Sequence, residues 1–123
     1  TGDGAILRLM QQTPYKYAAE LILVGEPIDA ARAERWGLIS RVVDEADLLA
    51  CARAMARGIV QSAPLAIEYS KAAMKETVAC DDLEGGTGWA IMDHYQELIN
   101  ATEDSLEGPR AFAEKRQPVW KGR

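Results

Sequence analysis

Basic and aromatic side chains gather between residues 110 and 123, and they are the strongest sign of chemistry in the sequence. The members are Arg110, Lys115, Arg116, Lys121 and Arg123, with Phe112 and Trp120 among them. Cations of this kind suit phosphate groups, and aromatic rings with aliphatic stems suit the flat base of a nucleotide. An ordinary solvated chain end fits equally well, because cations also favour the carboxyl end of a helix. Composition leaves both interpretations open.

The other candidate catalytic or binding residues give weaker signals. His94 is the single histidine, in a segment expected to be helical. It could act as a general base, but a surface or packed helix residue is the preferred interpretation. Gly2 and Gly4 resemble the start of a phosphate-binding loop, although no strand precedes them. Asp3 is a candidate acid, because the backbone of this glycine-rich opening can approach a ligand closely. No nucleophile with an adjacent base is found.

Composition excludes several classes of function. The chain has 123 residues, enough for one domain, and a net charge of -5 that argues against nucleic-acid binding. Cys51 and Cys80 form no CxxC pair, and one histidine cannot complete the usual zinc ligand sets, so two free thiols in a reducing cytoplasm are expected. No apolar run is long enough to span a bilayer, and no signal peptide is visible. The first residue, Thr1, is not Met, which suits processing, an expression boundary or a cut.

The elements that must position these groups are mainly helices. Caps at Thr13 and Asp29, glycines and apolar periodicity predict helices over 14–24, 29–36, 44 or 47 to 59, 64–75, 89–100 and 109–116. A turn capped at Thr102 has Asp104 where the helix dipole favours an acid, and residues 108–109 interrupt the chain before the last helix. Residues 38–43, LISRVV, are β-branched and short, which predicts a strand with no obvious partner in the chain. Glycines at 85, 86 and 88 predict a loop or frayed turn over 81–88. The expected fold is therefore mostly α, with one or two short strands.

Five segments together resemble the enoyl-CoA hydratase/isomerase (crotonase) superfamily. Residues 107–123, EGPRAFAEKRQPVWKGR, are similar to its closing signature. Residues 25–30 (GEPIDA), 36–43 (WGLISRVV) and 63–66 (APLA, with Lys71) are similar to three internal motifs, and residues 2–9 (GDGAILRL) to a glycine-rich loop. The Pro- and Trp-containing ending looks most like the carnitinyl-CoA dehydratase branch. The segments occur in the family's order, so the resemblance covers the whole chain.

The resemblance implies a fold and a division of the chain. The family has an amino-terminal α/β core of ββα units, followed by helices used in trimer assembly. Residues 1–43 would end that core, and residues 44–123 would be the carboxyl-terminal helical region. The oxyanion-hole amides and both catalytic glutamates of the hydratases would then lie upstream of Thr1, in a missing amino-terminal half. The implied assembly is a homo-oligomer, a trimer or a hexamer, in the cytoplasm.

The implied site residues are few. Phe112 and Lys115 match positions that contact the CoA moiety, and Gly2 matches a glycine near the reactive water. Asp3 lies one residue from the place where some members use an acid. Asp3, Ala5 and the glycines at 85, 86 and 88 depart from the usual hydratase pattern, which puts the acyl specificity in doubt.

The implied function is an acyl-CoA lyase that hydrates 2-enoyl-CoA or dehydrates 3-hydroxyacyl-CoA through an oxyanion-stabilised enolate. Acyl-CoA would be the substrate, and no separate cofactor or metal is implied. The alternatives are another crotonase reaction (isomerisation, decarboxylation or carbon–carbon hydrolysis) and a non-catalytic helical assembly module. Fold alone does not choose among them.

Overall fold

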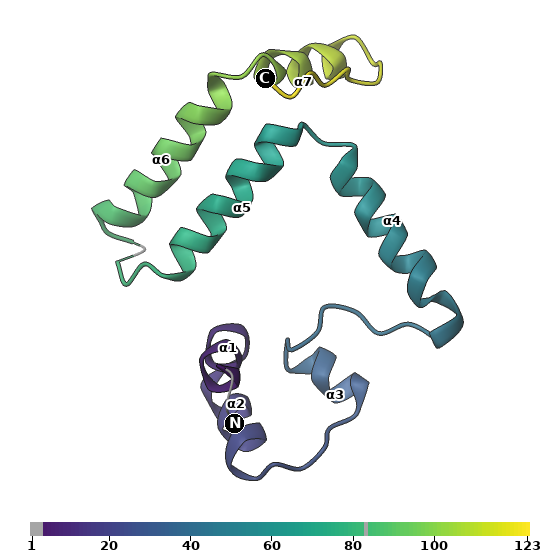
Figure 1. Cartoon of the computed structure of the whole chain (residues 1–123), viewed down its shortest axis with the longest axis vertical. Helices are drawn as coiled ribbons and strands as arrows, with labels where there is room; N and C mark the ends of the chain where they lie inside the picture. Colours follow the sequence, from purple (N-terminus) through teal and green to yellow (C-terminus); the bar gives the residue numbers. More distant parts are fainter. Residues whose placement is uncertain (1–3, 83) are drawn as a thin grey trace. The chain divides into compact units, whose positions relative to one another are not determined.

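The computed structural model describes residues 4–82 and 84–123, and over these residues the chain is helical (Figure 1). Its elements in order are α1 (Ala5–Gln12), α2 (Tyr15–Leu23), α3 (Ala30–Arg35), the 3-10 helix η1 (Glu45–Asp47), α4 (Leu48–Val60), α5 (Pro64–Val78), α6 (Gly86–Asn100) and α7 (Asp104–Ala113). The chain divides into two compact units, Thr1–Cys51 and Ala52–Arg123, called unit 1 and unit 2 below. The division falls within α4, and the two units are described separately.

Unit 1 is organised around an aromatic stack. The rings of Tyr17 on α2 and Trp36 after α3 lie parallel, with centroids 4.6 Å apart. The Arg32 guanidinium lies over the Trp36 ring, 4.3 Å from its centroid, and also forms an ion pair with Glu20. Asp29 caps α3, since its side chain accepts the backbone N–H of Arg32 at 2.6 Å, as the sequence predicted. The stack joins α2 to α3 and accounts for the burial of Trp36.

Two features of unit 1 differ from the sequence-based expectation. Thr13 was expected to cap the start of α2, but its hydroxyl donates to the carbonyl of Leu9, so it ends the unpredicted helix α1. The predicted strand over 38–43 was wrong, because this segment forms bends and extended coil. The N–H of Leu38 is bound to Ala33 of α3 and that of Val42 to the Glu34 carboxylate. These N–H groups are therefore not available to a sheet ladder.

In unit 2, α5 and α6 run side by side (Figure 1) and are joined by a hydrogen bond of 2.5 Å from the Tyr95 hydroxyl to Glu76. The predicted loop over 81–88 is shorter than expected, because α6 begins at Gly86 rather than Trp89. Gly88 is buried, and its N–H donates to the carbonyl of Asp82. Packing against α5 thus offsets the cost of glycines in the first turn of α6. A Cβ at Gly85 would meet the exposed Asp82 carboxylate, so that side chain would have to move aside to admit another residue.

Helix α7 is continuous through Pro109, where the sequence predicted an interruption. Proline has a helical φ and removes only the N–H that would bond the carbonyl of Ser105. The chain's last residues also hold α7 from outside: Trp120 packs where Gly108 leaves space, and a Cβ on Gly108 would stand 3.4 Å from its ring. One lost hydrogen bond is therefore tolerated. The expected cap at Thr102 is present, since its hydroxyl accepts the N–H of Ser105.

The buried apolar residues are mostly small. They are Ala18, Ala33, Trp36, Ala73 and Ala111, and no large side chain among the described residues is fully buried. Alanines at contacts let helices approach closely, but they bury little apolar area. Many large apolar side chains remain exposed on the helices, including Leu23, Val60, Met74 and Trp89. No helix within the described residues combines the length and apolarity needed to cross a bilayer.

The mostly α fold predicted from the sequence is confirmed over the described residues, and no strand occurs in them. The predicted boundary between 43 and 44 lies near the division at Cys51 and Ala52, but these two divisions rest on different criteria. The first boundary separates an expected α/β core from a helical region, and it stays a prediction.

Candidate functional site

The end of α7 carries the most unusual backbone of the described chain. Lys115 has φ 51, the left-handed region, and it is the only non-glycine residue with positive φ in the described residues. Its N–H donates to the carbonyl of Phe112 at 3.2 Å, and the N–H of Arg116 donates to Ala111 at 3.0 Å. This pair of bonds is the Schellman motif, which usually places glycine at the left-handed position. The chain therefore holds a long cationic side chain where glycine would fit without strain.

The end of α3 supplies an internal comparison. There Gly37 takes the left-handed position with φ 75, and the same two bonds are formed, from Gly37 to Glu34 and from Leu38 to Ala33. A non-glycine residue in this conformation costs about 1–2 kcal/mol, through the approach of its Cβ to the following carbonyl oxygen. Strain of this kind is found most often where a side chain has a function. Lys115 is accordingly the first candidate of the site.

The other cations of the basic-aromatic ending are occupied by carboxylates. Arg116 pairs with Glu107 and Glu114 at 2.6 Å each, and Arg110 pairs with Glu114 at 3.0 Å. Lys121 and Arg123 both pair with Glu103, at 2.6 and 3.1 Å. Among the five cationic residues between 110 and 123, Lys115 alone has no carboxylate partner in the described part of the chain. The structure thus separates one available cation from four engaged in ion pairs.

Phe112 lies three residues before Lys115, in the last turn of α7. Its side chain is 87% exposed, the highest value among the exposed large apolar residues of the described chain. Lys115 is exposed as well. An exposed ring next to an available cation is a combination that can bind a flat base and a phosphate together. The pair Phe112 and Lys115, predicted from the resemblance, is therefore placed on one accessible helix end.

The residues after this turn, 117–123, form a tail that is fastened to unit 2 by buried polar groups. Asp104 is 3% exposed, and its two carboxylate oxygens accept the N–H groups of Lys121 and Gly122, each at 2.8 Å. The indole N–H of Trp120 donates to the carbonyl of Gln61 at 2.7 Å. The sequence indicated Asp104 only as an acid favoured by the helix dipole. Its buried role depends on a tail that returns from 17 residues away.

Glu107 links the turn to the tail. Its carboxylate accepts Arg116 through both oxygens, at 2.6 and 3.0 Å, and the N–H of Val119 at 2.7 Å. These hydrogen bonds, that from Arg116 first, lower the pKa of Glu107 from its ordinary 4.5 to about 2. The Arg116 side chain, bound to Glu107 and Glu114, has its pKa raised in turn. Both groups are therefore ionised throughout the neutral range.

The lowered pKa of Glu107 predicts acid sensitivity. In the unfolded chain Glu107 binds a proton near pH 4.5, but in the folded chain it binds one only near pH 2. Its stabilising contribution is thus present above pH 4.5 and is lost as the pH falls from 4.5 towards 2. Glu107→Gln should flatten the fall of Tm with pH in this window, as measured by circular dichroism. A matched change in unit 1, Glu26→Gln, should leave the slope as it is, and equal slopes for all three proteins would contradict the assignment.

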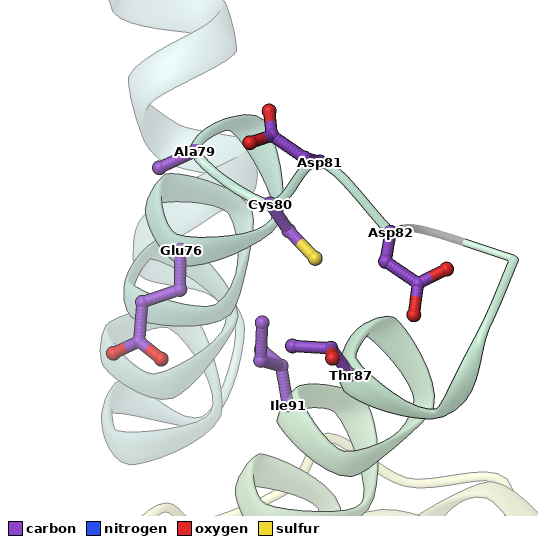
Figure 2. Close-up of a pocket in the computed structure, with 7 residues that line it drawn as sticks. All are labelled: Glu76, Ala79, Cys80, Asp81, Asp82, Thr87 and Ile91. Atoms are coloured by element: carbon purple, nitrogen blue, oxygen red, sulfur yellow. The ribbon is translucent and has the colours of Figure 1, made fainter.

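A second feature is a shallow hollow at the turn between α5 and α6 (Figure 2). It has a volume of about 490 Å³ and is lined by Glu76, Ala79, Cys80, Asp81, Asp82, Thr87 and Ile91. Figure 2 shows the Cys80 sulfur directed towards Ile91 and Thr87, while the Asp81 carboxylate points outwards. Glu76 is engaged by the Tyr95 hydroxyl, which raises the pKa of Tyr95. Within the described residues the Cys80 thiol forms no hydrogen bond with a carboxylate of the hollow.

The remaining sequence candidates have separate outcomes. His94 lies exposed on α6 with the edge of its ring towards Tyr95 at 5.1 Å, which fits the preferred interpretation as a surface helix residue. Gly2 and Asp3 lie outside the described residues, so their roles stay predictions. Cys51 and Cys80 are free thiols. No group of three or more metal-binding side chains occurs within 4–82 and 84–123.

The end of α7 thus carries a cation in a left-handed backbone and an exposed ring, and comparison with known proteins identifies the family of the chain. Residues 1–123 match the family described as enoyl-CoA hydratase/isomerase, and the chain belongs to this family. The resemblance stated from the sequence is thereby confirmed.

Individual relatives place the chain more closely. It is 41% identical over 127 residues to carnitinyl-CoA dehydratases of Salmonella heidelberg and Salmonella typhi, covering 98% of this chain and 47% of each relative. It is similar to the crystal structures of enoyl-CoA hydratases from Bacillus anthracis (34% identity, TM-score 0.93, 99% of this chain and 46% of that one) and Mycobacterium tuberculosis H37Rv (31%, 0.83, 99% and 47%). The chain spans about half the length of the curated relatives it matches, and over that span it has their fold.

Proposed function

We propose that this chain is the carboxyl-terminal half of an acyl-CoA lyase, which hydrates 2-enoyl-CoA or dehydrates 3-hydroxyacyl-CoA. In this reaction water adds across, or leaves from, the double bond next to the thioester, and the enolate passes its charge to an oxyanion hole. Two glutamates upstream of the chain would handle the water and the α-proton. The dehydratase names of the relatives at 41% identity favour the dehydration direction, with carnitinyl-CoA as a first substrate to try. Other crotonase reactions remain the alternative.

The observation that carries the proposal is Lys115. It is a cation held in a left-handed backbone, without a carboxylate partner in the described residues, near an exposed Phe112. An acyl-CoA presents phosphate groups and an adenine ring, which this pair can bind. The proposal assigns the acid–base groups of the reaction to the amino-terminal half. The chain's share of the site would thus be binding of the CoA moiety.

Replacing Lys115 tests the proposal in the full-length protein. Lys115→Ala should raise KM for the acyl-CoA about tenfold with little change in kcat, because a charge-assisted bond to phosphate contributes roughly 1.5–3 kcal/mol and acts on substrate and transition state alike. Lys121→Ala is the matched control, since Lys121 is paired with Glu103, and it should change KM much less. An unchanged KM for Lys115→Ala would remove Lys115 from the site.

Lys115→Gly separates the ligand contact from the backbone. Glycine relieves the left-handed strain, so this variant should be as stable as the parent or about 0.5–1 kcal/mol more stable, while KM rises as for Lys115→Ala. Thermal unfolding followed by circular dichroism gives the first quantity and steady-state kinetics the second. A variant that gains stability and loses affinity would support the view that the strain is kept for the ligand.

A second candidate function, a helical assembly module, is favoured by the exposed apolar side chains of unit 2. Met74 and Val78 on α5 and Trp89 on α6 are each about two-thirds exposed (66%, 64% and 66%), which is unusual for side chains of this size. These faces would be covered by the missing amino-terminal half or by other subunits of a trimer or hexamer. The two functions are compatible, because a subunit interface and a CoA contact can share one helical region. Solubility in the cytoplasm is expected for such an enzyme.

A further inference from the structure

The left-handed turn at Lys115 must be held in place by its surroundings, because its strained conformation is not the one that this backbone prefers by itself. The residue that follows, Arg116, supplies the means. Its N–H forms the Schellman bond that spans more residues, to the carbonyl of Ala111, and its guanidinium is paired with two carboxylates that precede the turn, Glu107 and Glu114. If Arg116 moved, the hydrogen bond from its N–H to the carbonyl of Ala111 would break, and the backbone would no longer fix the direction of the Lys115 side chain.

Glu107 is the group that fixes Arg116 most firmly. It forms a two-pronged ion pair, from Nη1 to Oε1 at 2.6 Å and from Nη2 to Oε2 at 3.0 Å. Such pairs restrict orientation as well as distance. The Glu107 side chain is 19% exposed, much less than that of Glu114 at 44%, so solvent weakens its interaction less. Glu114 is also shared with Arg110.

Of the two carboxylates that pair with Arg116 in the described residues, Glu107 alone also accepts a backbone N–H from the tail. Its Oε1 accepts the N–H of Val119 at 2.7 Å, so the same oxygen holds the residues on the far side of Arg116. The guanidinium also donates to the carbonyl of Gln117 at 3.1 Å. Glu107 on α7 therefore binds the chain at two places after the turn, at the side chain of Arg116 and at the backbone of Val119.

We infer that Glu107 is a positioning residue for ligand binding: through Arg116 and Val119 it holds the left-handed turn that directs Lys115 towards the phosphate groups of the substrate. This inference rests on the proposed CoA contact of Lys115 and goes beyond it. Glu107 does not touch the ligand. Its effect passes through the backbone at residues 115 and 116, so it depends on the presence of the Lys115 side chain.

The test is a double-mutant cycle on the full-length protein, with the dissociation constant of free CoA measured by isothermal titration calorimetry. Glu107→Gln keeps the shape of the side chain and removes its charge, so it should weaken CoA binding about three- to tenfold. In a Lys115→Ala background the same change should have no further effect on affinity, since there is no cation left to position. Glu103→Gln, which alters a carboxylate bonded to Lys121 and Arg123, is the matched control and should leave affinity unchanged.

The outcomes separate the inference from the proposed function. If Lys115→Ala itself leaves CoA affinity unchanged, the proposed function of Lys115 fails. If Lys115→Ala weakens binding but Glu107→Gln does not, or if the two effects add, Glu107 does not position Lys115. Should Glu107→Gln not fold, Arg116→Lys takes its place in the cycle, because lysine keeps the charge and lacks the two-pronged geometry. The same coupling with Lys115→Ala is then required.

Discussion

Replacing Asp104 by alanine is expected to destabilise unit 2 by about 3 kcal/mol, because the variant leaves two backbone N–H groups without their charged acceptor. The carboxylate is 3% exposed and accepts Lys121 and Gly122 at 2.8 Å each. A loss of this size should lower Tm by roughly 10–20 °C in a unit of this length.

The control for Asp104 is a carboxylate of the same type that lies in solvent. Asp93 on α6 is exposed, and Asp93→Ala should change stability by less than about 0.5 kcal/mol. Asp104→Asn should fall between the two, since its amide keeps one accepting oxygen and turns a donor towards the other N–H. Thermal and urea unfolding followed by circular dichroism measure all three. Equal stabilities of Asp104→Ala and Asp93→Ala would show that the tail is not held by this carboxylate.

The second large effect concerns catalysis. The 123-residue chain by itself is expected to hydrate crotonyl-CoA no faster than background, because hydration needs an oxyanion hole and acid–base groups, and the proposal places both in the amino-terminal half. A full-length protein would by contrast accelerate the reaction by many orders of magnitude. Loss of absorbance of the conjugated thioester follows the reaction directly.

The comparison requires two controls. Circular dichroism must show that the 123-residue chain is helical, so that inactivity is not due to unfolding. Under the proposal, a protein that contains both this chain and the amino-terminal half should be active. Turnover by the 123-residue chain alone would overturn the placement of the catalytic glutamates and would direct attention to residues such as Asp3.

The helices of this chain were predictable where local chemistry decides the structure. Asp29 caps α3, Pro64 opens α5 and the apolar stripe of α4 lies where its periodicity indicated. The prediction failed where a distant group competes for the same backbone. The segment 38–43 has the composition of a strand, but the N–H of Leu38 is bound to the carbonyl of Ala33 and that of Val42 to the Glu34 carboxylate. Likewise, α6 extends over Gly86 and Gly88, where the N–H of Gly88 is bound to the carbonyl of Asp82.

In the candidate site, too, residue types were predictable and contacts between distant residues were not. Residue types alone indicated a basic and aromatic ending, and resemblance to a family singled out Phe112 and Lys115. Neither could show that Glu103 and Glu107 engage other cations of this ending, since those pairs depend on how the chain turns back after α7. Asp104 was not recognised as an organising residue, because its partners are backbone N–H groups that carry no sequence signal. Glu107 was missed because Arg116 and Val119 lie 9 and 12 residues away, beyond the end of its helix.

The sequence by itself determined the family, the helical character and the identity of the cation and ring that meet the ligand in our proposal. These depend on residue types and short spacings, which are written directly in the chain. Only the tertiary structure decided which cation is available and what holds it. A left-handed backbone at Lys115 and a carboxylate at Glu107 that binds Arg116 and Val119 arise from contacts across the folded chain, where the geometry of several segments must agree at once.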